Sequence, residues 1–166
     1  MSTQDTPFGS WRHIVGSLAL AVLLEQWPWT GWALALRPDF VLMGVLFWVL
    51  HQPGRVGIGV AFCLGLVADF QDGVVFGQHA IAYAIGAWLV LFLRLRLLQF
   101  DPLRQAAQLF PVLLAVQLGV LLVGWLAVNP PATLAMLLPV LSTTLLWYLV
   151  AGFLRAWHGR SLQDQA

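Results

Sequence analysis

Long hydrophobic runs alternate with short polar breaks along almost the whole chain. Six such runs have the hydropathy of membrane-spanning helices, which need about 20 residues each. They cover residues 12–27, 39–51, 55–70, 77–94, 105–128 and 133–155. The second run is short, so a tilted span or a re-entrant segment fits it. The breaks are rich in proline, glycine, aspartate and asparagine, which are turn signals.

The composition is not that of a water-soluble protein. The chain has 166 residues, of which 60% are hydrophobic and 9% are charged, with a mean hydropathy of +0.83. A soluble domain of this length needs a far more polar surface. We therefore predict an all-α polytopic membrane protein, with residues 1–166 forming one integral membrane domain, a six-transmembrane-helix bundle. The net charge of +1 gives no reason to expect nucleic acid as a partner.

The arginines set the predicted orientation. With both termini in the cytoplasm, one arginine, Arg37, lies outside, which is a strong positive-inside bias. A re-entrant second segment would move Arg55 outside and break the alternation, so six crossings are favoured. Glu25 and Pro28 precede Ala33-Leu34-Ala35, which loosely matches a small-x-small cleavage site, so an uncleaved first span is favoured over a signal peptide. The arginines expected inside are Arg12, Arg55, Arg94, Arg96, Arg104, Arg155 and Arg160.

Small or acidic residues recur every four positions from residue 57 to residue 77. Positions four apart share one helix face, and small residues there let another helix approach closely. The start of the series therefore predicts a helix-contact face, used either within the chain or for a partner. Its members are Gly57, Ala61 and Gly65, followed by Asp69 and then by Gly73 and Gly77, which permit a turn with positive φ.

Acidic residues near the ends of the spans predict an outer polar layer made of Glu25, Arg37, Asp39 and Asp69. A carboxylate at partial membrane depth needs a donor, water or an arginine. Arg37 is expected on the same side, so we expect it to pair with Asp69 or Asp39. The alternative for Asp69 is an outer-rim carboxylate held by loop amides.

The block Arg37-Pro38-Asp39 also has a purely structural interpretation. Pro38 suits the first turn of a helix, and Asp39 suits its positive N-terminal end, which predicts a helix cap at Asp39. Gln78 and His79 add polar atoms to the same layer, which is then either a small polar pocket or a wet rim.

The chain carries no recognisable catalytic set. It has no GxSxG, HExxH or glycine-rich phosphate loop, its four histidines are scattered, and Cys63 is its single cysteine. Hydroxyls at residues 142–144 are expected to bond the backbone or neighbouring helices rather than act as nucleophiles. We predict a protein that is not an enzyme, with no catalytic residue, cofactor or metal.

The chain resembles the rod shape-determining protein MreD family of bacterial inner membranes. Besides size and hydropathy, the resemblance rests on three blocks in order along the chain. These are Arg37-Pro38-Asp39 before residues 40–42, residues 48–50 followed by Pro53 and Arg55, and the segment from Gly65 through Asp69 and Gly73 to Gly77.

The resemblance implies a non-enzymatic subunit of the elongation machinery that maintains rod cell shape and supports lateral peptidoglycan synthesis. The implied partners are MreC above all, with MreB, RodA and a class B penicillin-binding protein in the same complex, and membrane lipid around it. A homodimer is left open. The alternative, by a likeness of fold to the six-helix substrate-binding subunits of vitamin transporters, is a small-molecule binding or transport subunit that uses the outer polar layer.

Overall fold

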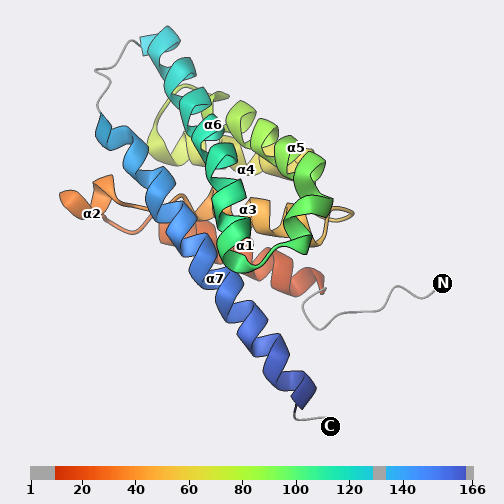
Figure 1. Ribbon diagram of the computed structural model, residues 1–166. Coiled ribbons are helices and arrows are strands. Elements are labelled where there is room, and N and C mark those ends of the chain that lie inside the picture. Colours follow the sequence, from red (N-terminus) through yellow and green to blue (C-terminus); the bar gives the residue numbers. More distant parts are fainter. Residues whose placement is uncertain (1–9, 129–133, 164–166) are drawn as a thin grey trace.

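A computed structural model of the protein describes residues 10–128 and 134–163, and the side chains of residues 10–127 and 135–153 (Figure 1). The described residues are helical and contain no strand, which confirms the all-α class. The elements are α1 (Trp11–Glu25), α2 (Trp32–Ala35), α3 (Phe40–His51), α4 (Ile58–Asp72), α5 (Gln78–Gln99), α6 (Pro102–Val128), the 3₁₀ turn η1 (Leu134–Leu137) and α7 (Leu138–Gln163).

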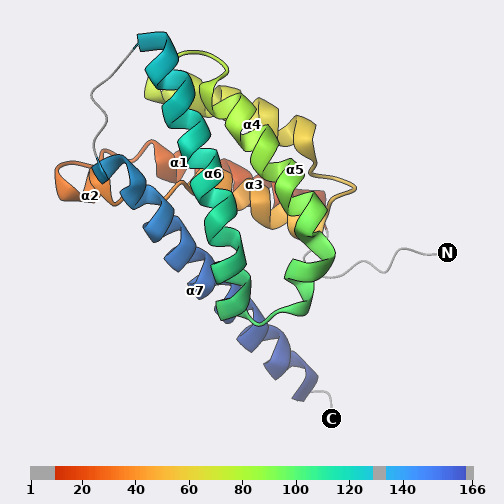
Figure 2. The ribbon, with the colours of Figure 1, turned by 45° about the horizontal axis from the view of Figure 1, so that its top comes forward.

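Apart from the four-residue α2, successive helices run in alternate directions, so their termini gather at two ends of one bundle (Figures 1 and 2). At one end the Phe40 N–H, at the start of α3, donates to Glu25 Oε2, at the end of α1, over 3.0 Å. At the other end Arg94 Nε donates to the Leu50 carbonyl near the end of α3 over 2.8 Å. We call these the acidic end and the basic end of the bundle.

Within the described residues, four stretches are long and apolar enough to cross a membrane, where the sequence predicted six. The other two predicted spans correspond to α1 and α4, which have 15 residues each. At 1.5 Å per residue each extends about 22 Å, short of the roughly 30 Å hydrocarbon core. The second predicted span reaches the required length when α2 is counted with α3. The four stretches are Trp32–His51, Gln78–Gln99, Pro102–Ala127 and Ala135–Phe153.

Some observed helix boundaries differ from the predicted ones, because local chemistry extends or ends a helix. The predicted third span began at residue 55, but residues 52–57 form a turn, and α4 begins after Gly57. The predicted fourth span ended at residue 94, whereas α5 continues to Gln99. The start of α6 at Pro102 places a proline at the first helical position, where its missing N–H costs nothing.

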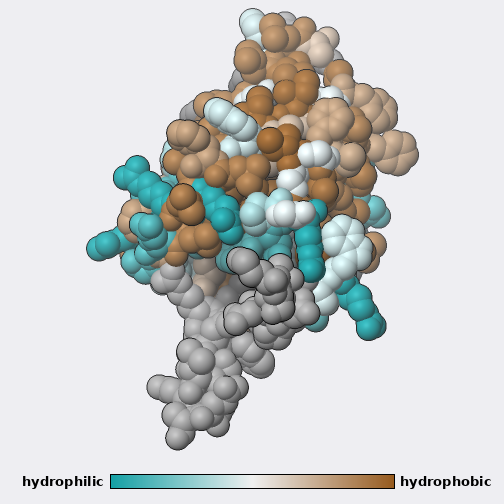
Figure 3. Space-filling model, turned by 90° about the vertical axis from the view of Figure 1, so that its right-hand side faces the viewer, coloured by the Kyte–Doolittle hydropathy of each residue, from teal (hydrophilic) through white to brown (hydrophobic). Residues whose placement is uncertain are grey.

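The outward surface of the bundle is apolar. Phe92 is 78% exposed, and Leu95, Leu122 and Leu126 also face outwards. Figure 3 shows hydrophobic (brown) atoms over the upper part of one face, with hydrophilic (teal) atoms gathered below them. Such a surface favours aggregation in water but suits contact with lipid chains.

The closest helix contact joins α4 to α5. A Cβ added to Gly65 would lie 2.7 Å from both the Ala80 nitrogen and the His79 carbonyl oxygen, so only glycine fits. Ala61, one turn earlier on the same face, is fully buried. Gly57 instead precedes α4 as its N-cap, and an added Cβ there would meet only the Pro53 carbonyl oxygen, at 3.9 Å. The small-residue face is thus covered by α5 at Gly65 and buried at Ala61, and a partner helix cannot use it without displacing α5.

Replacing Gly65 with alanine is expected to destabilise the bundle by about 1–3 kcal/mol, because the contact atoms belong to the backbone of α5 and cannot rotate away. Unfolding in mixed micelles with increasing denaturing detergent measures the loss. Gly59→Ala in the same helix is the control, since an added Cβ there has no neighbour within 4 Å. Equal stability of the two variants would contradict the close approach.

Candidate functional site: a polar layer at the acidic end

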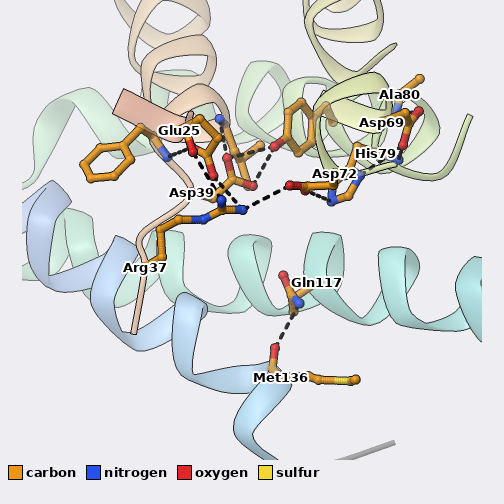
Figure 4. Close-up of polar contacts among 12 residues, drawn as sticks. Glu25, Arg37, Asp39, Asp69, Asp72, His79, Ala80, Gln117 and Met136 are labelled. Carbon is orange, nitrogen blue, oxygen red and sulfur yellow. Dashed lines mark hydrogen bonds and ion pairs between the residues drawn. The ribbon is translucent and has the colours of Figure 1, made fainter. Parts of the chain in front are cut away.

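Arg37 lies at the centre of a group of carboxylates, just before α3 (Figure 4). Its Nη2 atom is 3.1 Å from Glu25 Oε1 and 3.3 Å from Asp72 Oδ1. Its Nη1 atom donates to the Glu25 carbonyl over 3.2 Å. Glu25 ends α1 and Asp72 ends α4, so one guanidinium joins the ends of two helices to the chain entering α3.

Asp39 connects α3 to α5 and α7. Its Oδ1 accepts the Leu42 N–H at 2.7 Å, the N-cap of α3 that the sequence predicted. The Tyr83 hydroxyl on α5 lies 2.8 Å and 2.7 Å from its two carboxylate oxygens. The backbone N–H of Asp39 donates to Thr143 Oγ1 on α7 over 2.9 Å. Tyr83 and Thr143 are each 2% exposed, so these bonds form out of contact with bulk solvent.

Asp69 is fully buried and fixes the turn from α4 to α5. Its carboxylate accepts the backbone N–H groups of Gly77 at 2.8 Å, His79 at 2.7 Å and Ala80 at 3.4 Å. Two of these belong to the first turn of α5, where N–H groups have no partner within the helix. The turn itself needs glycine at Gly73, with φ +64°, and at Gly77, with φ +100°.

His79 links Asp69 to the arginine cluster. Its Nδ1 is 3.0 Å from Asp69 Oδ1, and its Nε2 is 3.9 Å from Asp72 Oδ2. The His79 ring also lies edge to face with that of Tyr83, with centroids 5.7 Å apart, which joins this group to that of Asp39. We define the polar layer as the residues of both groups: Glu25, Arg37, Asp39, Asp69, Asp72, His79, Tyr83 and Thr143.

Two expectations about this layer were wrong. Arg37 pairs with Glu25 and Asp72 rather than with Asp69 or Asp39. Pro38 precedes the N-cap of α3 instead of lying in its first turn. The structure does bring Glu25, Arg37 and Asp39 together. Asp69 joins them through His79.

Three members of the layer, Asp72, Tyr83 and Thr143, have no predicted role in it. The pair Asp72-Gly73 at the break after the third hydrophobic run predicts only a turn, although Asp72 lies three residues after Asp69 on the same helix. Tyr83 follows His79 by four residues, and that spacing on one helix face was the available signal. Thr143 was expected to bond the backbone or another helix, and its oxygen accepts from the backbone of Asp39.

A cavity of about 10 Å³ borders the layer, lined by Asp39, Gln117, Pro139, Thr143 and three aliphatic side chains. That is about the space of one water molecule, whereas sites for small organic ligands enclose roughly 300–1,000 Å³. Among the described residues, no three histidine, cysteine, aspartate or glutamate side chains are placed to hold a metal ion. The geometry supports a structural role: each carboxylate accepts from donors on other segments and ties helix ends together.

An all-helical membrane protein with a polar layer inside one end of its bundle is the class that this fold and site define. A family model described as rod shape-determining protein MreD matches residues 9–157. The chain therefore belongs to the MreD family, a family of shape-determining proteins that is not known for enzymatic activity.

One curated relative adds to the family match. The chain is 32% identical over 80 residues to the rod shape-determining protein MreD of Haemophilus influenzae. The aligned region covers 48% of this chain and 49% of the relative, so the match spans about half the length of that protein. No solved structure matches the chain.

Arg37→Gln is expected to lower the stability of the bundle by about 3 kcal/mol, at the lower end for a broken buried pair because the Arg37 side chain is 21% exposed. The change leaves Glu25 without its charged partner. Adding Glu25→Gln should recover part of the loss in the same unfolding assay. Arg104→Gln is the control, because its side chain is 72% exposed and exposed pairs contribute little. If the double variant loses as much stability as the two single variants together, or more, the pairing does not stabilise the protein.

Proposed function

We propose that this chain is a non-enzymatic, multi-pass subunit of the bacterial cytoplasmic membrane that maintains rod cell shape by binding MreC and supporting lateral peptidoglycan synthesis. MreB, RodA and a class B penicillin-binding protein are its proposed neighbours in the same complex. The observation that carries the proposal is the match of the MreD family model to residues 9–157.

The polar layer suits a scaffold in this proposal. It connects α1, α3, α4, α5 and α7 through bonds between segments far apart in the sequence. Helix ends tied in this way keep the outer faces of the bundle in fixed positions, which is what a partner helix needs in order to recognise them. The face around Gly65 is covered by α5, so the proposed contact with MreC uses another part of the outer surface.

We further propose a single membrane domain with six crossings and both termini in the cytoplasm. The alternating helix directions support this topology, as does the placement of Arg12, Arg55, Arg94, Arg96 and Arg104 at one end, with Arg37 at the other. The basic end then faces the cytoplasm. The water-sized cavity beside Asp39 does not favour the alternative of a vitamin-sized ligand.

Purification of the tagged chain in mild detergent is expected to recover MreC, followed by cell-wall synthases. In cells whose only copy is Arg37→Gln, rods should become round, because the loosened layer no longer fixes the helices. Cells carrying Arg37→Gln with Glu25→Gln should recover in part, and Gln99→Ala, an exposed residue at the basic end, should leave rods unchanged. Absence of MreC from the purified wild-type protein, or rods that persist when the chain is depleted, would refute the proposal.

The topology has its own test in a Cys63→Ser background. A thiol at Thr30→Cys, between α1 and α2, should react in intact cells with a maleimide that cannot cross the membrane. A thiol at Gly54→Cys, between α3 and α4, should react only after the cells are opened. Both positions are exposed, so access to them is not limited by the fold. Equal labelling of the two positions in intact cells would exclude the crossing of α3.

A further inference from the structure

Charge is distributed unequally between the two ends of the bundle. At the acidic end four carboxylates turn inwards and are bonded within the chain, with Asp69 fully buried and Glu25 8% exposed. At the basic end the charged groups face outwards. Four exposed arginines surround this end and form what we call the basic rim: Arg12 at the start of α1, Arg55 before α4, Arg96 in the last turn of α5 and Arg104 in the first turn of α6.

Among the described side chains, these four guanidinium groups form no hydrogen bond. Their neighbour Arg94 is different, because its Nε is bonded to the Leu50 carbonyl and closes the end of α3. Within the rim, the one ion pair among described side chains joins Arg104 to Asp101 at 3.9 Å, with the side chains 72% and 55% exposed. Such a pair contributes little to stability. Arg104 also lies at a helix N-terminus, where the helix dipole disfavours a cation.

Exposed apolar side chains alternate with the rim arginines. Leu95 is 74% exposed beside Arg96, Leu103 is 65% exposed beside Arg104, and Trp11 is 57% exposed beside Arg12. Aliphatic and indole groups next to guanidinium groups suit the boundary between acyl chains and headgroups. A docking surface for an acidic soluble protein would not need exposed leucines beside its arginines.

We infer that the basic rim binds the phosphate groups of anionic phospholipids in the adjacent leaflet. A guanidinium group donates two parallel hydrogen bonds to a phosphate, so arginine suits this ligand better than a point charge does. The apolar neighbours contact the first part of the acyl chains. This lipid site is independent of the contact with MreC proposed above.

The test compares thermal unfolding of the full chain in mild detergent with added phosphatidylglycerol or with phosphatidylcholine of the same acyl chains. Phosphatidylglycerol should stabilise the protein more, and the difference should shrink with added salt. The variant Arg55→Gln/Arg96→Gln/Arg104→Gln should lose the difference, with an affinity for phosphatidylglycerol that falls about fivefold per arginine. The corresponding triple lysine variant should keep most of it, and Asp101→Asn should enlarge it.

Several outcomes would overturn the inference. Equal effects of the two lipids on the wild-type protein would do so, as would a phosphatidylglycerol effect that survives in the triple glutamine variant. A shift of the same size with inorganic phosphate would show a site for a free anion. The same shift with a polyglutamate peptide would show a docking surface for an acidic protein. If the triple variant does not fold, Arg104→Gln, the change at the most solvent-exposed pair, is used with the same expectation of an about fivefold weaker effect.

Discussion

Carboxylates buried within a helical membrane bundle are the constraint on which the rest of this structure depends. An isolated carboxylate in a medium of low dielectric constant costs several kcal/mol, so each needs charged partners or hydrogen-bond donors. Asp69 takes its donors from the first turn of α5 and Asp39 from Tyr83 and the backbone of α3, while Glu25 and Asp72 share Arg37. Each requirement joins two elements. The helix ends at the acidic end are therefore positioned by polar bonds, and apolar side chains pack between the helices in the rest of the bundle.

The local parts of this arrangement were predictable from the sequence. Asp39 caps α3 through a bond to a residue three positions later, which depends on local backbone geometry alone. The approach of another helix at Gly65 follows from small residues spaced four apart. Glu25, Arg37 and Asp39 were also expected to lie in one layer because all three occur near the ends of hydrophobic runs.

Which side chains of the layer bond to one another could not be predicted in the same way. Asp69 and Asp72 are one helical turn apart, and only the rotation of α4 against α5 decides which of them meets Arg37 and which is used by the backbone of the next helix. That rotation is set by the contact at Gly65, a tertiary feature. The spacing of Tyr83 from His79 places both on one helix face, but it does not show that the Tyr83 hydroxyl meets Asp39. Thr143 likewise gives no signal of its partner, because a threonine in an apolar helix can also bond its own backbone.

The lengths of the helices show how deep in a membrane the buried carboxylates would lie. In α1, α3 and α4 the helical stretches that lack charged residues and histidine are 14–24, 40–50 and 58–68, and each has 11 residues. At 1.5 Å per residue these stretches extend about 16 Å, roughly half of a hydrocarbon core of about 30 Å. In the topology proposed above, with the basic end at one membrane surface, the polar layer therefore lies well inside the bilayer. The exposed side chains of Trp27, Trp32 and Phe76 lie in the loops and short helix that follow α1 and α4 at the acidic end, and they extend the apolar surface beyond the layer. In that placement, internal bonding of the carboxylates is what allows α1 and α4 to end, and α3 to begin, at this depth.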